Sequence, residues 1–76
     1  MKIKYDSEKD AIYVRLLNNT IRYGRDLDDR RHLDYDSEHN LVGIDFLNVK
    51  KNGLDFNGLP KIDPTAVMNL LFSDPS

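Results

Sequence analysis

The stretch Tyr5-Asp6-Ser7-Glu8 occurs a second time, thirty positions later, as Tyr35-Asp36-Ser37-Glu38. Four identical residues at a fixed offset in a chain of 76 residues indicate that one structural unit is present twice. Apolar residues at alternate positions flank both copies and match between them: Ile3, Ile12, Val14 and Leu16 around the first, and Leu33, Val42, Ile44 and Phe46 around the second. The repeat predicts two similar β-hairpin units, each turning at its Tyr-Asp-Ser-Glu sequence.

The first unit is predicted to span residues 2–27. Residues 2–5 and 11–17 alternate polar and apolar side chains, as half-buried strands do, and Asp and Ser between them favour a turn. Asn18-Asn19 is a second turn candidate, because asparagine accepts the left-handed conformation of tight hairpin turns. A third strand should follow, with side chains at even spacing: Ile21, Tyr23, Arg25 and Leu27.

The second unit is predicted to span residues 32–56, after a polar loop at residues 26–31. Its strongest strand covers residues 41–47, with Val42, Ile44 and Phe46 on one face and Leu41, Gly43, Asp45 and Leu47 on the other. Asn52-Gly53 is the clearest short hairpin signal in the chain, since both residues tolerate positive φ. It predicts that residues 54–56 fold back as a strand against the end of residues 41–47.

A helix is predicted over residues 64–72. Asp63 is a favourable N-cap and Pro64 suits the first helical position, where its missing N–H is not needed. Apolar residues then recur at helical spacing: Val67, Met68, Leu70, Leu71 and Phe72. The expected fold is a single α+β domain over residues 1–76, with an antiparallel β-meander of five to six strands and this short C-terminal helix.

Composition places limits on the class of protein. Hydrophobic residues make up 39% of the chain and charged residues 32%, which is typical of a soluble globular domain rather than a disordered one. The absence of cysteine excludes disulfides and thiolate metal sites. A net charge of -2 lacks the basic excess of most nucleic-acid-binding proteins. The start of the chain has no apolar stretch of signal-peptide length, so we expect a cytoplasmic protein without a membrane span.

One short helix can cover only part of a sheet this wide. The sheet face opposite the predicted core is not uniformly polar, because it carries Ala11, Tyr13, Leu41 and Leu47. We therefore expect a homodimer, formed by sheet packing or by exchange of the C-terminal helix.

Asp34, Asp36, Glu38, Asn40 and Asp45 follow the ligand spacing of a calcium loop. The glycine and glutamate that such a loop requires are replaced by His39 and Asp45, and its flanks are predicted strands rather than helices. A hydrogen-bonded turn is the better interpretation.

Asp36, Ser37 and His39 contain the residue types of a nucleophilic triad. Triad members come from separate elements that hold them together, whereas neighbours in one solvated turn diverge. His39 also corresponds to Lys9 in the first copy, so the shared serine is better explained by turn formation. We assign no catalytic, cofactor-binding or metal-binding residue, and we expect a protein that is not an enzyme.

Basic and aromatic residues give two further candidates. Arg22, Arg25, Arg30, Arg31 and His32 are interrupted by Asp26, Asp28 and Asp29, which indicates a charge-laced loop rather than a nucleic-acid surface. Tyr5, Tyr13, Tyr23 and Tyr35 could stack on bases, but Tyr5 and Tyr35 are expected in the core. Tyr13 corresponds to Gly43 in the repeat, and an aromatic ring covering a strand glycine is a structural alternative.

The sequence resembles a known family. The pattern Lys4-Tyr5-Asp6-x-Glu8-x-Asp10-Ala11-x-Tyr13-Val14-x-Leu16, then Leu33-Asp34-Tyr35-Asp36 and Leu41-Val42-Gly43-Ile44-Asp45, is similar to the small prokaryotic family catalogued as domain of unknown function 2283. The resemblance covers about residues 2–48. The family has Gly in place of His39, which leaves the type of the second turn open, and it has Glu in place of Asp45. It implies a compact β-rich domain, in a family often suspected of supplying the antitoxin-like half of small two-gene modules.

Three functions remain from the sequence. The first is a non-enzymatic protein-interaction module, for example an antitoxin-like protein that masks a small basic partner, since the chain is acidic. The second is a small-molecule-binding protein or minor enzyme with a pocket at a dimer seam. The third, weak nucleic-acid binding, has the least support. The stripe of residues 67–72 could serve as a partner-binding helix, but core packing is its simpler role.

Overall fold

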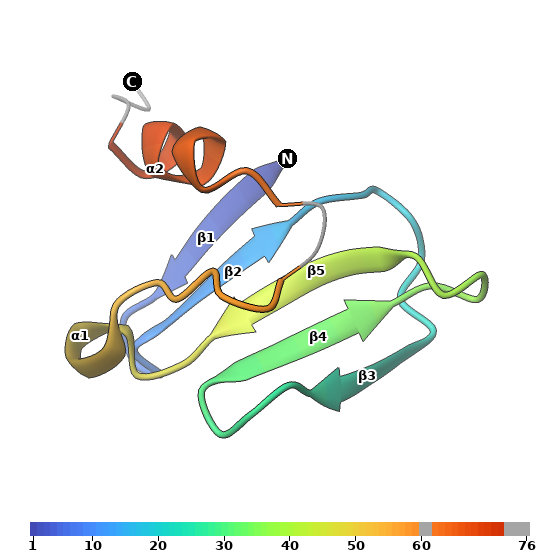
Figure 1. Ribbon diagram of the computed structural model, residues 1–76, viewed down its shortest axis with the longest axis horizontal. Helices are drawn as coiled ribbons and strands as arrows, with labels where there is room; N and C mark the ends of the chain where they lie inside the picture. Colours follow the sequence, from blue (N-terminus) through green and yellow to red (C-terminus); the bar gives the residue numbers. More distant parts are fainter. Residues whose placement is uncertain (60–61, 73–76) are drawn as a thin grey trace.

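The computed structural model describes residues 1–59 and 62–72 and has an α+β fold (Figure 1). The elements along the chain are β1 (Lys2–Asp6), β2 (Ala11–Arg15), β3 (Tyr23–Asp26), β4 (Arg31–Tyr35), β5 (Leu41–Phe46), α1 (Val49–Asn52) and α2 (Pro64–Phe72). The strands form one five-stranded sheet in which every neighbouring pair is antiparallel. The predicted fold class and the predicted helix over residues 64–72 are confirmed.

The strand order is β1-β2-β5-β4-β3, which differs from a simple meander. Each Tyr-Asp-Ser-Glu copy does turn a hairpin, β1–β2 in the first case and β4–β5 in the second. The predicted unit of residues 2–27 does not form, however, because β3 pairs with β4 and not with β2. The most deeply buried strand, β5, occupies the free edge of β2 instead. A strand buried on both faces needs a neighbour on each edge to satisfy its backbone.

The prediction of a hairpin at Asn52-Gly53 is wrong. Residues 49–52 form the short helix α1, and the N–H of Gly53 donates to the carbonyl oxygen of Val49 at the end of that helix. Residues 53–59 then cross the sheet without forming a strand. Both edges of β5 are already paired, with β2 and β4, so residues 54–56 have no edge on which to add. Leu54, Phe56 and Leu59 pack against the core instead.

The core lies between the sheet and the segment that comes after β5. Its buried members are Val14, Leu33, Leu41, Ile44, Phe46 and Val67. Strict alternation predicts Leu41 on the face opposite Ile44. The β4–β5 register shifts at Asp34 and Tyr35, so that Tyr35 lies opposite Leu41 while Asp34 lies opposite Gly43. A bulge of one residue reverses the direction of the side chains beyond it, and this brings Leu41 into the core.

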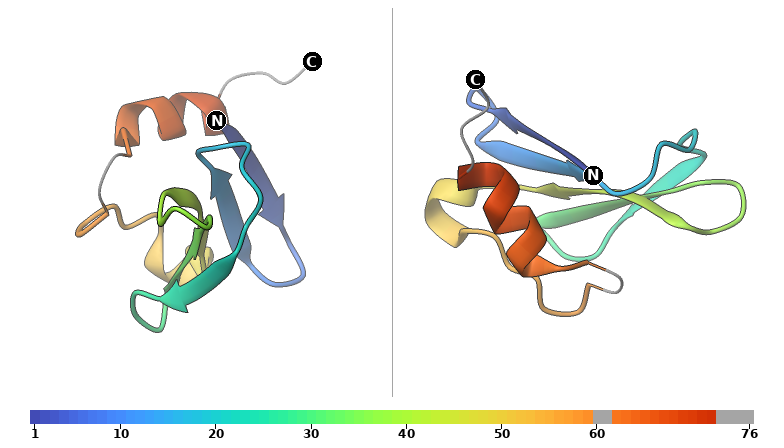
Figure 2. Two further views of the ribbon diagram at one scale, coloured as in Figure 1. Left: turned by 90° about the vertical axis from the view of Figure 1, so that its right-hand side faces the viewer. Right: turned by 90° about the horizontal axis from the view of Figure 1, so that it is seen from above.

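The two faces of the sheet are covered unequally. The helices α1 and α2 and residues 53–59 lie on one side of the sheet, which we call the core face (Figure 2). Val67 of α2 is fully buried there, whereas Met68 is exposed, and the side chains of residues 70–72 lie outside the described part. We call the other side, which these segments leave uncovered, the open face. In the described part of the chain, each helix is too short or too polar to cross a membrane.

Candidate functional site

A hydrogen bond between strands that are not neighbours organises the open face. The hydroxyl of Tyr13, on β2, donates to Oδ2 of Asp34, on β4, at 2.8 Å. The strand between them, β5, contributes Gly43 at this point, and a Cβ there would overlap the phenol of Tyr13. The glycine therefore lets the ring lie flat across β5. The expectation that Tyr13 covers Gly43 is confirmed.

The same hydrogen-bonded chain continues to the edge of the sheet. Oδ1 of Asp34 lies 3.2 Å from Nε2 of His32, and Nδ1 of His32 lies 2.8 Å from Oδ1 of Asp26 on β3. Gly24 provides the space, because a Cβ there would lie 2.5 Å from His32 Nε2 and 2.8 Å from Asp34 Oδ1. Tyr13, Asp34, His32 and Asp26, which we call the polar network, thus connect β2, β4 and β3 across the open face.

The surroundings shift the pKa values of three groups on this face. Burial, followed by the hydrogen bond to Asp34, raises the pKa of Tyr13. The hydrogen bond to Asp26 and the charge of Asp34 raise the pKa of His32, against the opposing effect of burial. Burial and the nearby Asp34 carboxylate raise the pKa of Asp45. The open face therefore favours a protonated His32, which can donate to carboxylates on both sides.

This arrangement suits recognition better than catalysis. A general base needs a free lone pair within reach of its substrate, yet both ring nitrogens of His32 face carboxylates of its own chain. A raised pKa also makes the Tyr13 hydroxyl a poor nucleophile at neutral pH. The polar network provides a set of polar groups with fixed positions.

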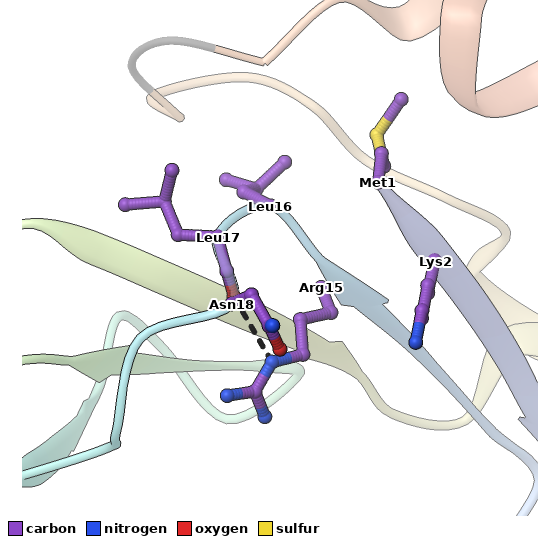
Figure 3. Close-up of a pocket in the computed structure, with 6 residues that line it drawn as sticks. All are labelled: Met1, Lys2, Arg15, Leu16, Leu17 and Asn18. Carbon is purple, nitrogen blue, oxygen red and sulfur yellow. Dashed lines mark hydrogen bonds between the residues drawn. The ribbon is translucent and has the colours of Figure 1, made fainter.

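The open face carries opposite charges on its two halves. The register places three cationic side chains and one carboxylate on the β1–β2 half, which is net positive: Lys2, Lys4, Arg15 and Asp6. The other half is net negative, because Asp26, Asp34 and Asp45 outnumber His32 there. A small hollow of about 180 Å³ lies at the end of β2, lined by Met1, Lys2, Arg15, Leu16, Leu17 and Asn18 (Figure 3). Within it, Nε of Arg15 donates to the carbonyl oxygen of Leu17 at 3.0 Å. This bond ties the guanidinium to the chain leaving β2.

The residues of the candidate calcium loop do not converge. Oδ1 of Asp36 accepts the N–H groups of Glu38 and Asn40, and its Oδ2 accepts the side-chain amides of Asn40 and Asn19. The hydrogen bonds from Asn19 and Asn40 lower the pKa of Asp36 to about 2. Asp34 belongs to the polar network instead. In the described residues, no three acidic or histidine side chains gather as metal ligands would. The interpretation of Asp36 as part of a hydrogen-bonded turn is confirmed.

The candidate triad does not form either. Nδ1 of His39 is hydrogen-bonded to the Tyr23 hydroxyl at 2.7 Å, while the bonds of Asp36 go to other residues. His39 adopts positive φ, of 66°, in the turn of the second hairpin. In the first hairpin the positive φ falls on Asp10, one position later in the repeat. The two turns therefore share their aspartate chemistry and differ in backbone.

Two of the basic residues hold the segment that covers the core. Arg31 is buried, and its guanidinium binds Oδ2 of Asp28 and the backbone carbonyl oxygens of Asp55 and Asn57. Arg30 lies 3.5 Å from the carboxylate of Asp55. The interpretation of residues 26–31 as a charge-laced loop is confirmed for these two arginines, which pair with carboxylates.

The tyrosines separate into different settings. Tyr35 packs against the core and stacks on Tyr23, with ring centroids 5.2 Å apart and Arg25 over the Tyr35 ring. The prediction that Tyr5 is a core residue is wrong, since its side chain is 46% exposed. Tyr5 lies on the edge strand β1, which has a neighbouring strand on one side only.

Sequence reasoning did not single out His32 and Asp26 as partners. A signal was present in the pattern. His32 and Asp34 alternate on one strand, so they share a face, and Gly24 and Gly43 leave space on neighbouring strands. The sequence lacked the order of the strands, which puts these positions side by side.

Comparison with known families gives a match over most of the chain. Residues 2–50 fit the model of the family described as "Protein of unknown function (DUF2283)". No curated protein and no solved structure matches the chain. The matched residues contain the whole five-stranded sheet, including the polar network, and end at the start of α1. The chain therefore belongs to the DUF2283 family.

Proposed function

We propose that this chain is a non-enzymatic protein-interaction module that binds a small partner protein across its open face. The observation that carries the proposal is the Tyr13–Asp34 hydrogen bond across Gly43, on a face that α1 and α2 leave uncovered. Polar groups that already hold their positions lose little freedom when a partner binds. A preorganised polar face supports recognition of another protein surface.

The distribution of charge indicates the kind of surface that such a partner would present. Cationic groups would lie over the half that carries Asp26, Asp34 and Asp45, and anionic groups over the half that carries Lys2 and Lys4. Complementary charges of this kind speed association and select the partner. An antitoxin-like role corresponds to the case in which the partner is a small basic protein encoded beside this chain.

The test is co-expression of this chain with the product of the adjacent reading frame. Asp45→Lys reverses a charge on the open face, and Glu38→Lys makes the same change in the exposed turn of the second hairpin. We expect the partner to be retained by the unmodified chain and by Glu38→Lys, and to bind Asp45→Lys at least about tenfold more weakly. Retention by both variants, or the absence of any retained partner, would contradict the proposal.

A second candidate is a small polar ligand. A hollow of about 200 Å³ on the open face is lined by Lys4, Asp6, Lys9, Ala11, Tyr13 and Asp45. Its volume is below the ~300–1,000 Å³ of typical ligand pockets, so it ranks second. Native mass spectrometry of the purified chain distinguishes the two candidates, because a bound small molecule that is absent from a Lys4→Glu variant would favour the ligand.

A further inference from the structure

The edge strand β3 is exposed along its whole length. It ends the strand order and pairs with β4 on one side only. All four of its residues are exposed, and within residues 1–59 and 62–72 no other segment lies beyond it in the sheet (Figure 1). An edge of this kind presents unpaired N–H and C=O groups to any strand that approaches.

The backbone groups that point outward can be identified from the register. The N–H of Leu27 donates to the carbonyl oxygen of Arg31 at 2.9 Å, so position 27 bonds toward β4. Bonded and non-bonded positions alternate along an antiparallel pair. Arg25 therefore also bonds toward β4, and the N–H and C=O groups of Gly24 and Asp26 face the free edge.

We propose that a second copy of this chain pairs with β3, antiparallel and about a two-fold axis that passes through Gly24. This register joins the outward groups of Gly24 to those of its symmetry mate. It sets Tyr23 opposite Arg25 of the second copy. Just before the strand, it also brings the side chain of Arg22 near Asp26 of the second copy; the N–H of Arg22 already donates to the carbonyl oxygen of Tyr35, so this contact involves side chains alone. A cation beside an aromatic ring and a cation beside a carboxylate are both favourable cross-strand pairs.

Neighbouring registers are less favourable. Shifting the axis to Arg25 keeps the backbone bonding possible but sets two arginines directly opposite each other at the closest spacing. The other free edge, β1, has a similar difficulty, because a two-fold axis through Lys4 sets Lys4 against its own copy. Lysine on an edge strand is a common protection against pairing, and β3 contains none.

The polar network prepares the β3 edge for pairing. His32 holds Asp26 at 2.8 Å and fills the space above Gly24, so the strand is already ordered. Ile21 and Tyr23 are 40% and 39% exposed and add apolar surface at the same edge. A four-residue strand buries little area, which predicts a weak and concentration-dependent dimer. The resulting dimer has one continuous sheet formed by the two copies, and each copy keeps its open face. Formation of this dimer does not depend on the partner protein proposed above.

The experiment exploits the symmetry of the interface. Arg22→Glu sets two carboxylates against each other at both contacts of a homodimer, and Asp26→Lys sets two cations against each other at both. In a mixed dimer of the two variants both contacts pair a carboxylate with a cation: the two substituted positions meet at one contact, and the unmodified Asp26 and Arg22 meet at the other. Analytical ultracentrifugation from micromolar to millimolar concentration measures association of each variant and of the mixture. Lys4→Glu, on the β1 edge, is the matched control.

We expect Arg22→Glu and Asp26→Lys each to dissociate at least about tenfold more readily than the unmodified chain, and the mixture to associate more tightly than either variant alone. Lys4→Glu should associate as the unmodified chain does. Asp26→Lys also loses its contact with His32, and recovery in the mixture shows that this loss is not the cause. A chain that stays monomeric throughout, or variants that associate unchanged, or a mixture no tighter than its parts would overturn the proposal.

Discussion

The hydroxyl of Tyr13 donates a hydrogen bond to Oδ2 of Asp34, and the phenol reaches it across Gly43 of the strand between them. The contact joins residues 21 positions apart and clamps β2 to β4 over β5. It ties together the two hairpins that the repeated sequence creates. Two substitutions test the contact, one that removes the Tyr13 hydroxyl and one that adds a methyl group at Gly43.

Tyr13→Phe removes the hydrogen bond and keeps the ring over Gly43. We expect a loss of about 1–2 kcal/mol in the free energy of unfolding, because the acceptor is a carboxylate and the site is only partly buried. Urea denaturation measures it. Tyr5→Phe, which removes a hydroxyl from an exposed ring, is the control and should change stability very little. Equal effects of the two substitutions would contradict the role assigned to the Tyr13 hydroxyl.

Gly43→Ala forces the phenol of Tyr13 away from the sheet. We expect a destabilisation of about 2 kcal/mol, typical of an added methyl group that displaces a packed side chain. The same substitution made in a Tyr13→Ala chain should cost far less, since the space above the strand is then free. A double-mutant cycle measured by urea denaturation gives this coupling. Additive effects would show that the ring does not limit the residue at position 43.

His32 should make stability depend on pH. The pKa of His32 in the folded chain is raised above the ordinary value of 6.5. Its contribution to the stability of the fold is therefore complete below pH 6.5 and is lost as the pH rises through the folded pKa. The stability difference between the unmodified chain and His32→Gln should therefore be larger near about pH 6 than near about pH 9. Thermal unfolding at several pH values measures it. A difference that does not vary with pH would contradict the contact of His32 with Asp26 and Asp34.

The two turn aspartates should differ in importance although they share one sequence motif. Asp36 accepts four hydrogen bonds and is buried, whereas Asp6 accepts two longer ones in an exposed turn. We expect Asp36→Ala to lower the melting temperature clearly more than Asp6→Ala does, because two asparagine amides lose their partner. Thermal unfolding of the two variants side by side measures the difference, and equal melting temperatures would count against it.

Unfolding at low pH gives a second test of how much the Asp36 carboxylate stabilises its turn. Hydrogen bonds lower its pKa from 3.8 to about 2, so its contribution is present above the unfolded value and disappears as pH falls toward 2. The gap in stability between the unmodified chain and Asp36→Ala should narrow over that interval. A gap that widens would mean that the carboxylate is not the group that stabilises the turn.

The sequence by itself determined the five strands that form, the two Tyr-Asp-Ser-Glu turns and the helix at residues 64–72. These features depend on contacts between residues close in the chain: alternation along a strand, a carboxylate that accepts N–H groups two to four positions ahead, and a proline at a helix start. Residues 2–50 also carried enough of the pattern to identify the family.

The tertiary structure alone decided the strand order and its consequences. Pairing of β2 with β5 left residues 54–56 without a free edge, and the bulge beside Asp34 turned Leu41 into the core. The same order brought Tyr13, His32 and Asp26 into one network from three separate strands. Which strands become neighbours depends on competition for buried edges across the whole chain, and no local pattern of residues records the outcome of that competition.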